Sequence, residues 1–311
     1  MSKRYLAVAS ALTICVLLGA HTAAQQPRIT NGRVVAAQAA GGLSQAIRSL
    51  VSAQTDTAWI GYAVPVRDRD RTMCCWSSSN GTTYMSGTMI GAPCCGSCRI
   101  EPASETAGAR PPAPASASPQ GPVKLEGAER MVILFRVVSR AVERVRTFSE
   151  DCELDAGGRQ VHWLENVDPT QSVTFLESLV GAEQDRKSRV TNAALQAISM
   201  HAAPTAAPTI ERLARSHPTA GVRGEALFWL AQMAGEKVAG TITAAIEQDP
   251  DTEVKRRAVF ALSQLPKGEG VPLLIDVARK NKNPVVRKQA VFWLGQTRDP
   301  RALEFFAEIL K

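Results

Sequence analysis

The hydrophobic positions from about residue 186 onward recur with a fixed step of 32 residues. Four units begin with the segments VTNAALQAI, VRGEALFWL, VKRRAVFAL and VRKQAVFWL, which start at Val190, Val222, Val254 and Val286. Apolar residues in each segment lie at i, i+4 and i+8, the spacing of one face of an α-helix. The pattern predicts an amphipathic first helix in each of four repeats.

A second apolar series follows in every unit, after a polar turn or a turn that contains Gly or Pro. One column holds Ile210, Ile242, Leu274 and Phe306, and the next holds Leu213, Ala245, Val277 and Ile309. Each unit is therefore predicted to be a helix pair, and helix pairs of this length stack into an α-solenoid. Close stacking is favoured by the small column of first-helix residues Ala194, Ala226, Ala258 and Ala290.

The segment WLENVDPTQSVTFLESLV (163–180) resembles the last unit, WLGQTRDPRALEFFAEIL (293–310), with one residue absent. We interpret residues 159–185 as a half-repeat that caps the array, so that the predicted solenoid extends over residues 159–311.

The region before the repeats is predicted to be a small β region. Residues 25–55 are predicted to be weakly ordered, with one short helix around Leu43–Ser52. Residues 56–101 contain AWIGYAVPV (58–66), which is rich in β-forming residues, and a cluster of cysteines. The expected fold class is mainly α, with a C-terminal α-solenoid preceded by this small disulfide-stapled β region.

The β region is predicted to continue after an interruption. Residues 102–122 are almost wholly Pro, Ala, Ser and Gly, which is typical of a disordered linker. Residues 123–158 follow with two β-forming runs at 131–138 and 141–149, whose short connection predicts a hairpin that completes the region.

The N-terminus has the pattern of a signal peptide over residues 1–24. Lys3 and Arg4 precede an apolar run from Tyr5 to Ala20, and the small residues TAA (22–24) precede the expected cleavage point. A retained membrane anchor is the alternative, disfavoured by the shortness of the run. We expect an exported protein, periplasmic or extracellular, with no stable membrane span after cleavage.

Six cysteines remain after the predicted cleavage, an even number that favours disulfides in an exported chain. The vicinal pairs are expected to reach distant partners, and 15 pairings are open. A zinc site at Cys74, Cys75, Cys95 and Cys98, or thiol exchange at Cys95-x-x-Cys98, are the alternatives. The six disulfide candidates are Cys74, Cys75, Cys94, Cys95, Cys98 and Cys152.

Two sets of repeated residues are candidates for binding. The phenylalanines Phe228, Phe260 and Phe292 form a column off the main apolar stripe, and either wedge between adjacent first helices or form an exposed aromatic ladder. A basic set recurs at the start of the first helices and is either a solvated rim or a contact for an acidic partner. Its members are Arg223, Lys255, Arg256, Arg257, Arg287 and Lys288.

The segment VRKQAVFWLGQTRDPRALEFFAEIL (286–310) resembles HEAT repeats of the short class described in phycobilin lyases. The valine, the basic residue, the alanine, the leucine four residues later and the Asp-Pro carry the resemblance. The whole layout is similar to that of exported bacterial HEAT-repeat proteins. The resemblance implies a curved platform for protein binding.

The same class contains bilin lyases and di-iron hydroxylases, whose His-Glu pairs hold the metal. Here none of the histidines His162, His201 and His217 precedes a glutamate. We therefore expect no metal and no cofactor. Because an exported protein rarely meets nucleic acid, we expect none as partner. The predicted function is a non-enzymatic scaffold in the cell envelope that binds a protein or peptide. The alternative is an enzyme or enzyme subunit related to the lyases and hydroxylases.

Overall fold

A computed structural model describes residues 26–39, 41–67, 98–101, 128–181, 189–234 and 238–310. The predicted signal peptide (1–24), the predicted linker (102–122) and four cysteines, Cys74, Cys75, Cys94 and Cys95, lie outside the described residues.

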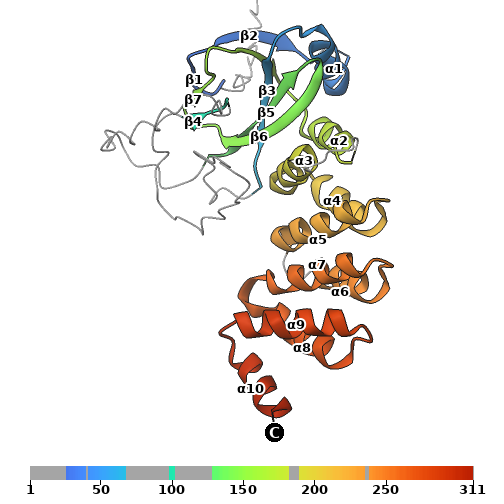
Figure 1. The fold of residues 1–311 in the computed structure, drawn as a ribbon. Helices are drawn as coiled ribbons and strands as arrows, with labels where there is room; N and C mark the ends of the chain where they lie inside the picture. The colour runs from blue at the N-terminus through green and yellow to red at the C-terminus, as the bar shows by residue number, and fades with distance from the viewer. Residues whose placement is uncertain are drawn as a thin grey trace, which may run out of the picture.

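A five-stranded mixed sheet lies at one end of the structure, and the stacked helices extend away from it (Figure 1). In spatial order the strands are β2 (Arg33–Gln38), β8 (Gln160–Glu165), β3 (Ala58–Pro65), β5 (Arg130–Val138) and β6 (Ala141–Ser149). The central strand β3 pairs in parallel with β8 and antiparallel with β5. The edges are formed by β2, parallel to β8, and by β6, antiparallel to β5.

Strand β3 is buried on both faces because its side chains alternate between two apolar cores. Ile60 and Tyr62 face the core that includes helix α1 (Leu43–Ala53) and helix α2 (Pro169–Ser178), whereas Trp59 and Ala63 face a second core. Strands β5 and β6 are joined by the two-residue turn Ser139-Arg140. Both turn residues have positive φ, 49° and 60°, as the tight turns that match strand twist require.

Two domain boundaries differ from the prediction. Within 25–55 the helix expected around Leu43–Ser52 is present as α1, whereas strand β2 was not expected, so weak order is wrong for that part of the segment. Residues 160–165 form strand β8 and not the start of a helical half-repeat. Trp163-Leu164 resembles Trp293-Leu294 of the last repeat in sequence only. Trp163 and Leu164 are neighbours in a strand, so their side chains enter opposite cores.

A small parallel sheet packs on the second core. It comprises β1 (Ile29–Thr30), β7 (Leu154–Asp155) and β4 (Cys98–Arg99), with β7 in the middle. Glu101, just after β4, accepts a hydrogen bond of 2.6 Å from Trp59 Nε1 and forms an ion pair of 2.9 Å with Arg136. Cys152 is fully buried in this core. These contacts fix the small sheet against the large one.

Four helix pairs follow α2 and form the solenoid. Consecutive first helices contact one another, and their alanine column is fully buried, which allows the close approach. In chain order the helices are α3 (Arg189–Met200), α4 (Ala206–Ser216), α5 (Ala220–Ala234), α6 (Ala239–Gln248), α7 (Thr252–Ser263), α8 (Gly270–Lys280), α9 (Pro284–Gln296) and α10 (Pro300–Ile309).

Several helices start where a side-chain cap and proline set the boundary. Asp168 accepts a hydrogen bond from Gln171 N before α2, Asn283 from Val285 N before α9, and Asp299 from Arg301 N before α10. Proline is the first helical residue in all three, where its missing N–H costs nothing.

The last second helix departs from the predicted columns. In α10 the buried residues are Ala302 and Phe305, whereas Phe306 is only half-buried and Ile309 is 51% exposed. The prediction that Ile309 continues the core column is wrong. In the same column Leu213 and Val277 are buried and Ala245 is half-buried, whereas Ile309 projects into solvent in the described structure.

The sheet and the solenoid are joined through the backbone. After β3 ends, Val66 pairs with His201 in the connection between α3 and α4. Ala202 N donates to Pro65 O at 3.1 Å, and Arg67 N donates to Met200 O at 2.9 Å. The first helix pair is thus attached to the central strand of the sheet.

Candidate interaction surface

Five aromatic rings form a continuous series across three first helices, which we call the aromatic ladder: Trp229, Phe228, Phe260, Trp293 and Phe292. The rings of Phe228 and Phe260 stack with centroids 5.6 Å apart and an interplanar angle of 1°. The ring of Trp293 lies 4.8 Å from that of Phe260 and joins α9 to α7. Neighbouring rings on α5 and on α9 complete the series at 5.0 Å.

Exposure changes along the ladder. Phe228 and Phe260 are half-buried, because each stacks on a ring of the adjacent repeat. Phe292 is 52% exposed, since its only ring contact is with its chain neighbour Trp293 among the described residues. Two members of the phenylalanine column therefore wedge between first helices, and the third presents its ring to solvent.

Exposed large apolar side chains concentrate on the last helix pair. Every such residue in the described ranges lies on α9 or α10 or directly after α10. Their exposed fractions are 48% for Val285, 52% for Phe292, 67% for Leu303, 51% for Ile309 and 83% for Leu310. The far end of the solenoid is thus the most apolar described surface.

Arg223, a predicted contact residue, is buried and serves the fold. Its guanidinium contacts the Asp249 carboxylate through two hydrogen bonds of 2.8 and 2.9 Å and donates to the carbonyls of His217 and Pro218. Burial alone would raise the pKa of Asp249, but the hydrogen bonds from Arg223 and the Asp251 backbone lower it overall. Arg223 cannot contact a partner in this conformation.

Arg287 occupies the same column two repeats later and acts similarly. It donates to the carbonyls of Asn281 and Lys282, at 2.8 and 3.1 Å, at the carboxyl end of α8. A cation at this end satisfies carbonyls that the helix leaves unpaired.

A polar column at the junction between repeats was not predicted from the sequence. His217 Nδ1, Asp249 Oδ1 and Asn281 Oδ1 each accept a hydrogen bond from the backbone N–H two residues later. The three positions are spaced by 32 residues, but their different residue types hide the repeat. This column fixes the turn into α5, α7 and α9.

The other basic residues remain at the surface. Arg256 pairs with Glu253 at 2.8 Å, Arg257 lies 3.6 Å from Glu225, and Lys255 donates to Glu247 O at 2.7 Å. Lys288 is exposed on α9, one turn before Phe292. These four surface residues, Lys255, Arg256, Arg257 and Lys288, all lie on α7 and α9, the helices of the exposed half of the ladder.

Two histidines are buried in structural roles. His201 Nε2 lies 2.9 Å from Ser172 Oγ, which lies 2.8 Å from the Tyr62 hydroxyl, and burial lowers the pKa of His201 to about 4. Burial also raises the pKa of Tyr62. These side chains are at most 1% exposed, so they link sheet to solenoid and are closed to a substrate.

His162 accepts hydrogen bonds from the side-chain amides of Gln54 and Gln160 at 3.0 and 2.9 Å. Both donors reach the same ring nitrogen, Nε2, which assigns the proton of the neutral ring to Nδ1. Burial lowers the pKa of His162, consistent with a neutral ring.

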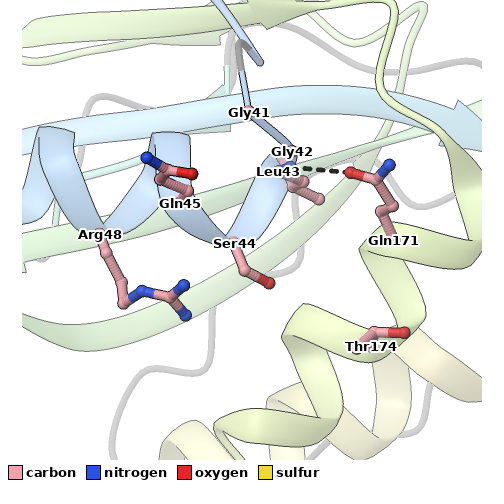
Figure 2. Close-up of a pocket in the computed structure, with 8 residues that line it drawn as sticks. All are labelled: Gly41, Gly42, Leu43, Ser44, Gln45, Arg48, Gln171 and Thr174. Atoms are coloured by element: carbon pink, nitrogen blue, oxygen red, sulfur yellow. Dashed lines mark hydrogen bonds between the residues drawn. The ribbon is translucent and has the colours of Figure 1, made fainter.

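A shallow pocket of about 270 Å³ lies where α1 and α2 begin (Figure 2). Gln171 of α2 points its Oε1 at Leu43 N, at 2.8 Å, and so caps the start of α1. Gly41 and Gly42 precede the helix with positive φ, 74° and 99°, and Arg48 lines the rim. The pocket was not predicted from the sequence, because no local pattern places α1 beside α2.

Within the described ranges, no three His, Cys, Asp or Glu side chains gather closely enough to hold a metal ion. In the same ranges, no helix has the length and apolar character to cross a membrane.

The helix pairs and their repeated columns have a counterpart among known families. Residues 239–311 match the family model of HEAT repeats. No curated protein shows a significant match to the chain. Among solved structures, human deoxyhypusine hydroxylase, determined in complex with glycerol, is similar at 18% identity and a TM-score of 0.31. The match covers 45% of this chain and 44% of that enzyme, so the chain spans less than half the enzyme's length.

Proposed function

We propose that the protein is a non-enzymatic scaffold that binds another protein or a peptide on its HEAT-like solenoid. The observation that carries this proposal is the exposed ring of Phe292 on α9, where the aromatic ladder reaches solvent. Apolar surface of this kind is typical of protein interaction sites, and stacked helical repeats provide extended binding surfaces.

The enzyme alternative is less favoured. Each described histidine has a structural role: His162 and His201 are buried in hydrogen-bonded clusters, and His217 caps the turn before α5. The 18% likeness to the hydroxylase, at a TM-score of 0.31, carries no argument about activity. We assign the repeats to the short HEAT-like class of the phycobilin lyases on the pattern of the last unit, 286–310, with its valine, basic residue, alanine, leucine and Asp-Pro.

We also propose that the protein is exported and acts in the cell envelope, and that disulfides stabilise its β region. The basic start, apolar run and small residues of 1–24 support export. The register that pairs Cys98 with Leu154 brings the backbone of β4 close to that of Cys152, which supports a disulfide in this region. N-terminal sequencing of the mature protein and mass mapping of unreduced peptides test both points. An uncleaved chain in the cytoplasm with free thiols contradicts them.

Cross-linking tests the scaffold role. The full-length chain, added to an extract of its own cells, is cross-linked through amines and analysed by mass spectrometry. Lys255, Lys280, Lys282 and Lys288 place reactive amines on and between α7, α8 and α9. We expect one saturable partner linked to these lysines. No saturable partner, or cross-links confined to residues before 166, contradicts the proposal.

A further inference from the structure

We propose that the partner is an acidic peptide segment with apolar side chains, which docks across helices α7 and α9. This inference rests on the proposed function and names its partner. The docking surface, which we call the α7–α9 ridge, comprises Arg256, Phe260, Lys288, Phe292 and Trp293.

The ridge combines cations with apolar rings at helical spacing. Lys288 precedes Phe292 by four residues on α9, and Arg256 precedes Phe260 by four on α7, so each pair shares a helix face. Arg256 Nε lies 3.4 Å from Gln289 Oε1, which directs its side chain toward α9. The two cation–ring pairs therefore lie side by side on neighbouring helices.

Charge on the ridge favours an acidic partner. Helices α7 and α9 together carry five basic residues and one acidic residue, whereas the second helices α6, α8 and α10 carry three basic and four acidic residues. The single acid, Glu253, offsets Arg256 and Arg257, and Arg287 is engaged with backbone carbonyls. An excess of positive charge remains, with Lys288 exposed at the ladder's solvent end.

The apolar anchor is Phe292. Its ring is fixed against Trp293 at 5.0 Å and an interplanar angle of 80°, yet half of its surface is exposed. A ring held by a neighbour loses little conformational freedom when a partner covers it, a property of residues that dominate binding energy. Packed helices lie about 8–10 Å apart, which corresponds to about three residues of an extended peptide. A segment of about six residues therefore spans both helices.

Peptide selection tests the proposal. A phage library of random 12-residue peptides is selected against the full-length chain, and the selected peptides are synthesised and titrated by fluorescence anisotropy. We expect enriched peptides that combine Asp or Glu with apolar residues. Phe292→Ser should weaken binding about tenfold, and Lys288→Glu should weaken it several-fold and reduce its dependence on salt.

Two matched variants control for folding and for general surface effects. Ile309→Ser removes an apolar side chain of equal exposure, 51% against 52%, from α10, and Lys280→Glu reverses an exposed lysine on α8. Both should bind the selected peptides as the original chain does. Circular dichroism of all four variants confirms that loss of binding is not loss of fold.

Other outcomes overturn the proposal. Enrichment of basic or proline-rich peptides, loss of binding in the controls but not in Phe292→Ser, or a preference for anionic vesicles over every peptide would do so. If an acidic peptide fails to emerge while cross-linking still finds a saturable partner on the solenoid, the ridge assignment fails and the scaffold role stands. If cross-linking finds none, the scaffold role itself fails.

Discussion

The two ends of the solenoid differ in what covers the same repeated positions. At the sheet end, β6 and α2 cover the first helix pair, and even the polar residues of this joint, Ser172 of α2 and His201 of the α3–α4 connection, are buried. At the far end, columns that are buried or half-buried inside the array reach solvent at Phe292 and Ile309. One periodic pattern therefore produces core at one end and surface at the other, because neighbours decide burial. The following predictions test this difference.

The largest effect is expected for Arg223→Ala compared with Arg287→Ala. The first change leaves the buried Asp249 carboxylate without its partner and should cost about 3–5 kcal/mol of unfolding free energy. The second removes only hydrogen bonds to two carbonyls and should cost about 1 kcal/mol. Urea unfolding of both variants measures the two values, and equal losses would contradict the distinction between the ends.

Acid should weaken the sheet end through His201. The unfolded chain binds a proton near the ordinary pKa of 6.5, whereas the buried native side chain does so only near 4. Stability should therefore fall as pH drops from about 6.5 to 4, by about 3 kcal/mol in total, and the contribution should be constant above that window.

Unfolding at a series of pH values compares the original chain with His201→Gln, which cannot titrate. The variant should show a flatter slope between pH 6.5 and 4. An unchanged slope would mean that other groups set the acid response.

The aromatic ladder gives a smaller contrast. Phe260→Ala removes a ring between Phe228 and Trp293 and should cost about 2 kcal/mol, below the value for a fully buried phenylalanine. Phe292→Ala should cost less than about 1 kcal/mol, since that ring is half exposed. Thermal unfolding measures both, and a larger loss for Phe292 would show that its ring is covered in solution.

The smallest effect is expected for Leu310→Ser and Leu303→Ser. Both side chains are largely exposed, so each change should alter stability by at most about 0.5 kcal/mol while raising solubility. Unfolding and light scattering measure the two quantities. A large loss of stability would indicate that another part of the molecule covers this end.

The solenoid could be predicted from sequence because its contacts are local and repeat every 32 residues. The alanine column, buried at Ala226 and Ala258, was visible from spacing alone. By contrast, β2 pairs with β8, which lies far along the chain, with Arg33 opposite Gln160. No local sequence pattern encodes a partner at that separation.

Within the candidate surface, sequence showed the phenylalanine column but not its exposure, which depends on stacking between repeats. The tryptophans Trp229 and Trp293 are half-buried members of the ladder that the phenylalanine column alone does not indicate. Its repeated position placed Arg223 in the basic set at the start of the first helices, because the carboxylate that buries it, Asp249, comes from the turn after α6, 26 residues later. These features arise from tertiary neighbours, which a single column of residues cannot reveal.

The joint between Pro65, Val66, Arg67 and the α3–α4 connection has a mechanical consequence. Backbone pairing on both sides of Val66 leaves little freedom for a hinge there, so the sheet and the first helix pair should move as one body. Bending is then distributed over the later pairs, where contacts between first helices are made by side chains. Relative to the sheet, the displacement of the helix pairs should therefore increase along the solenoid and be largest at α9 and α10.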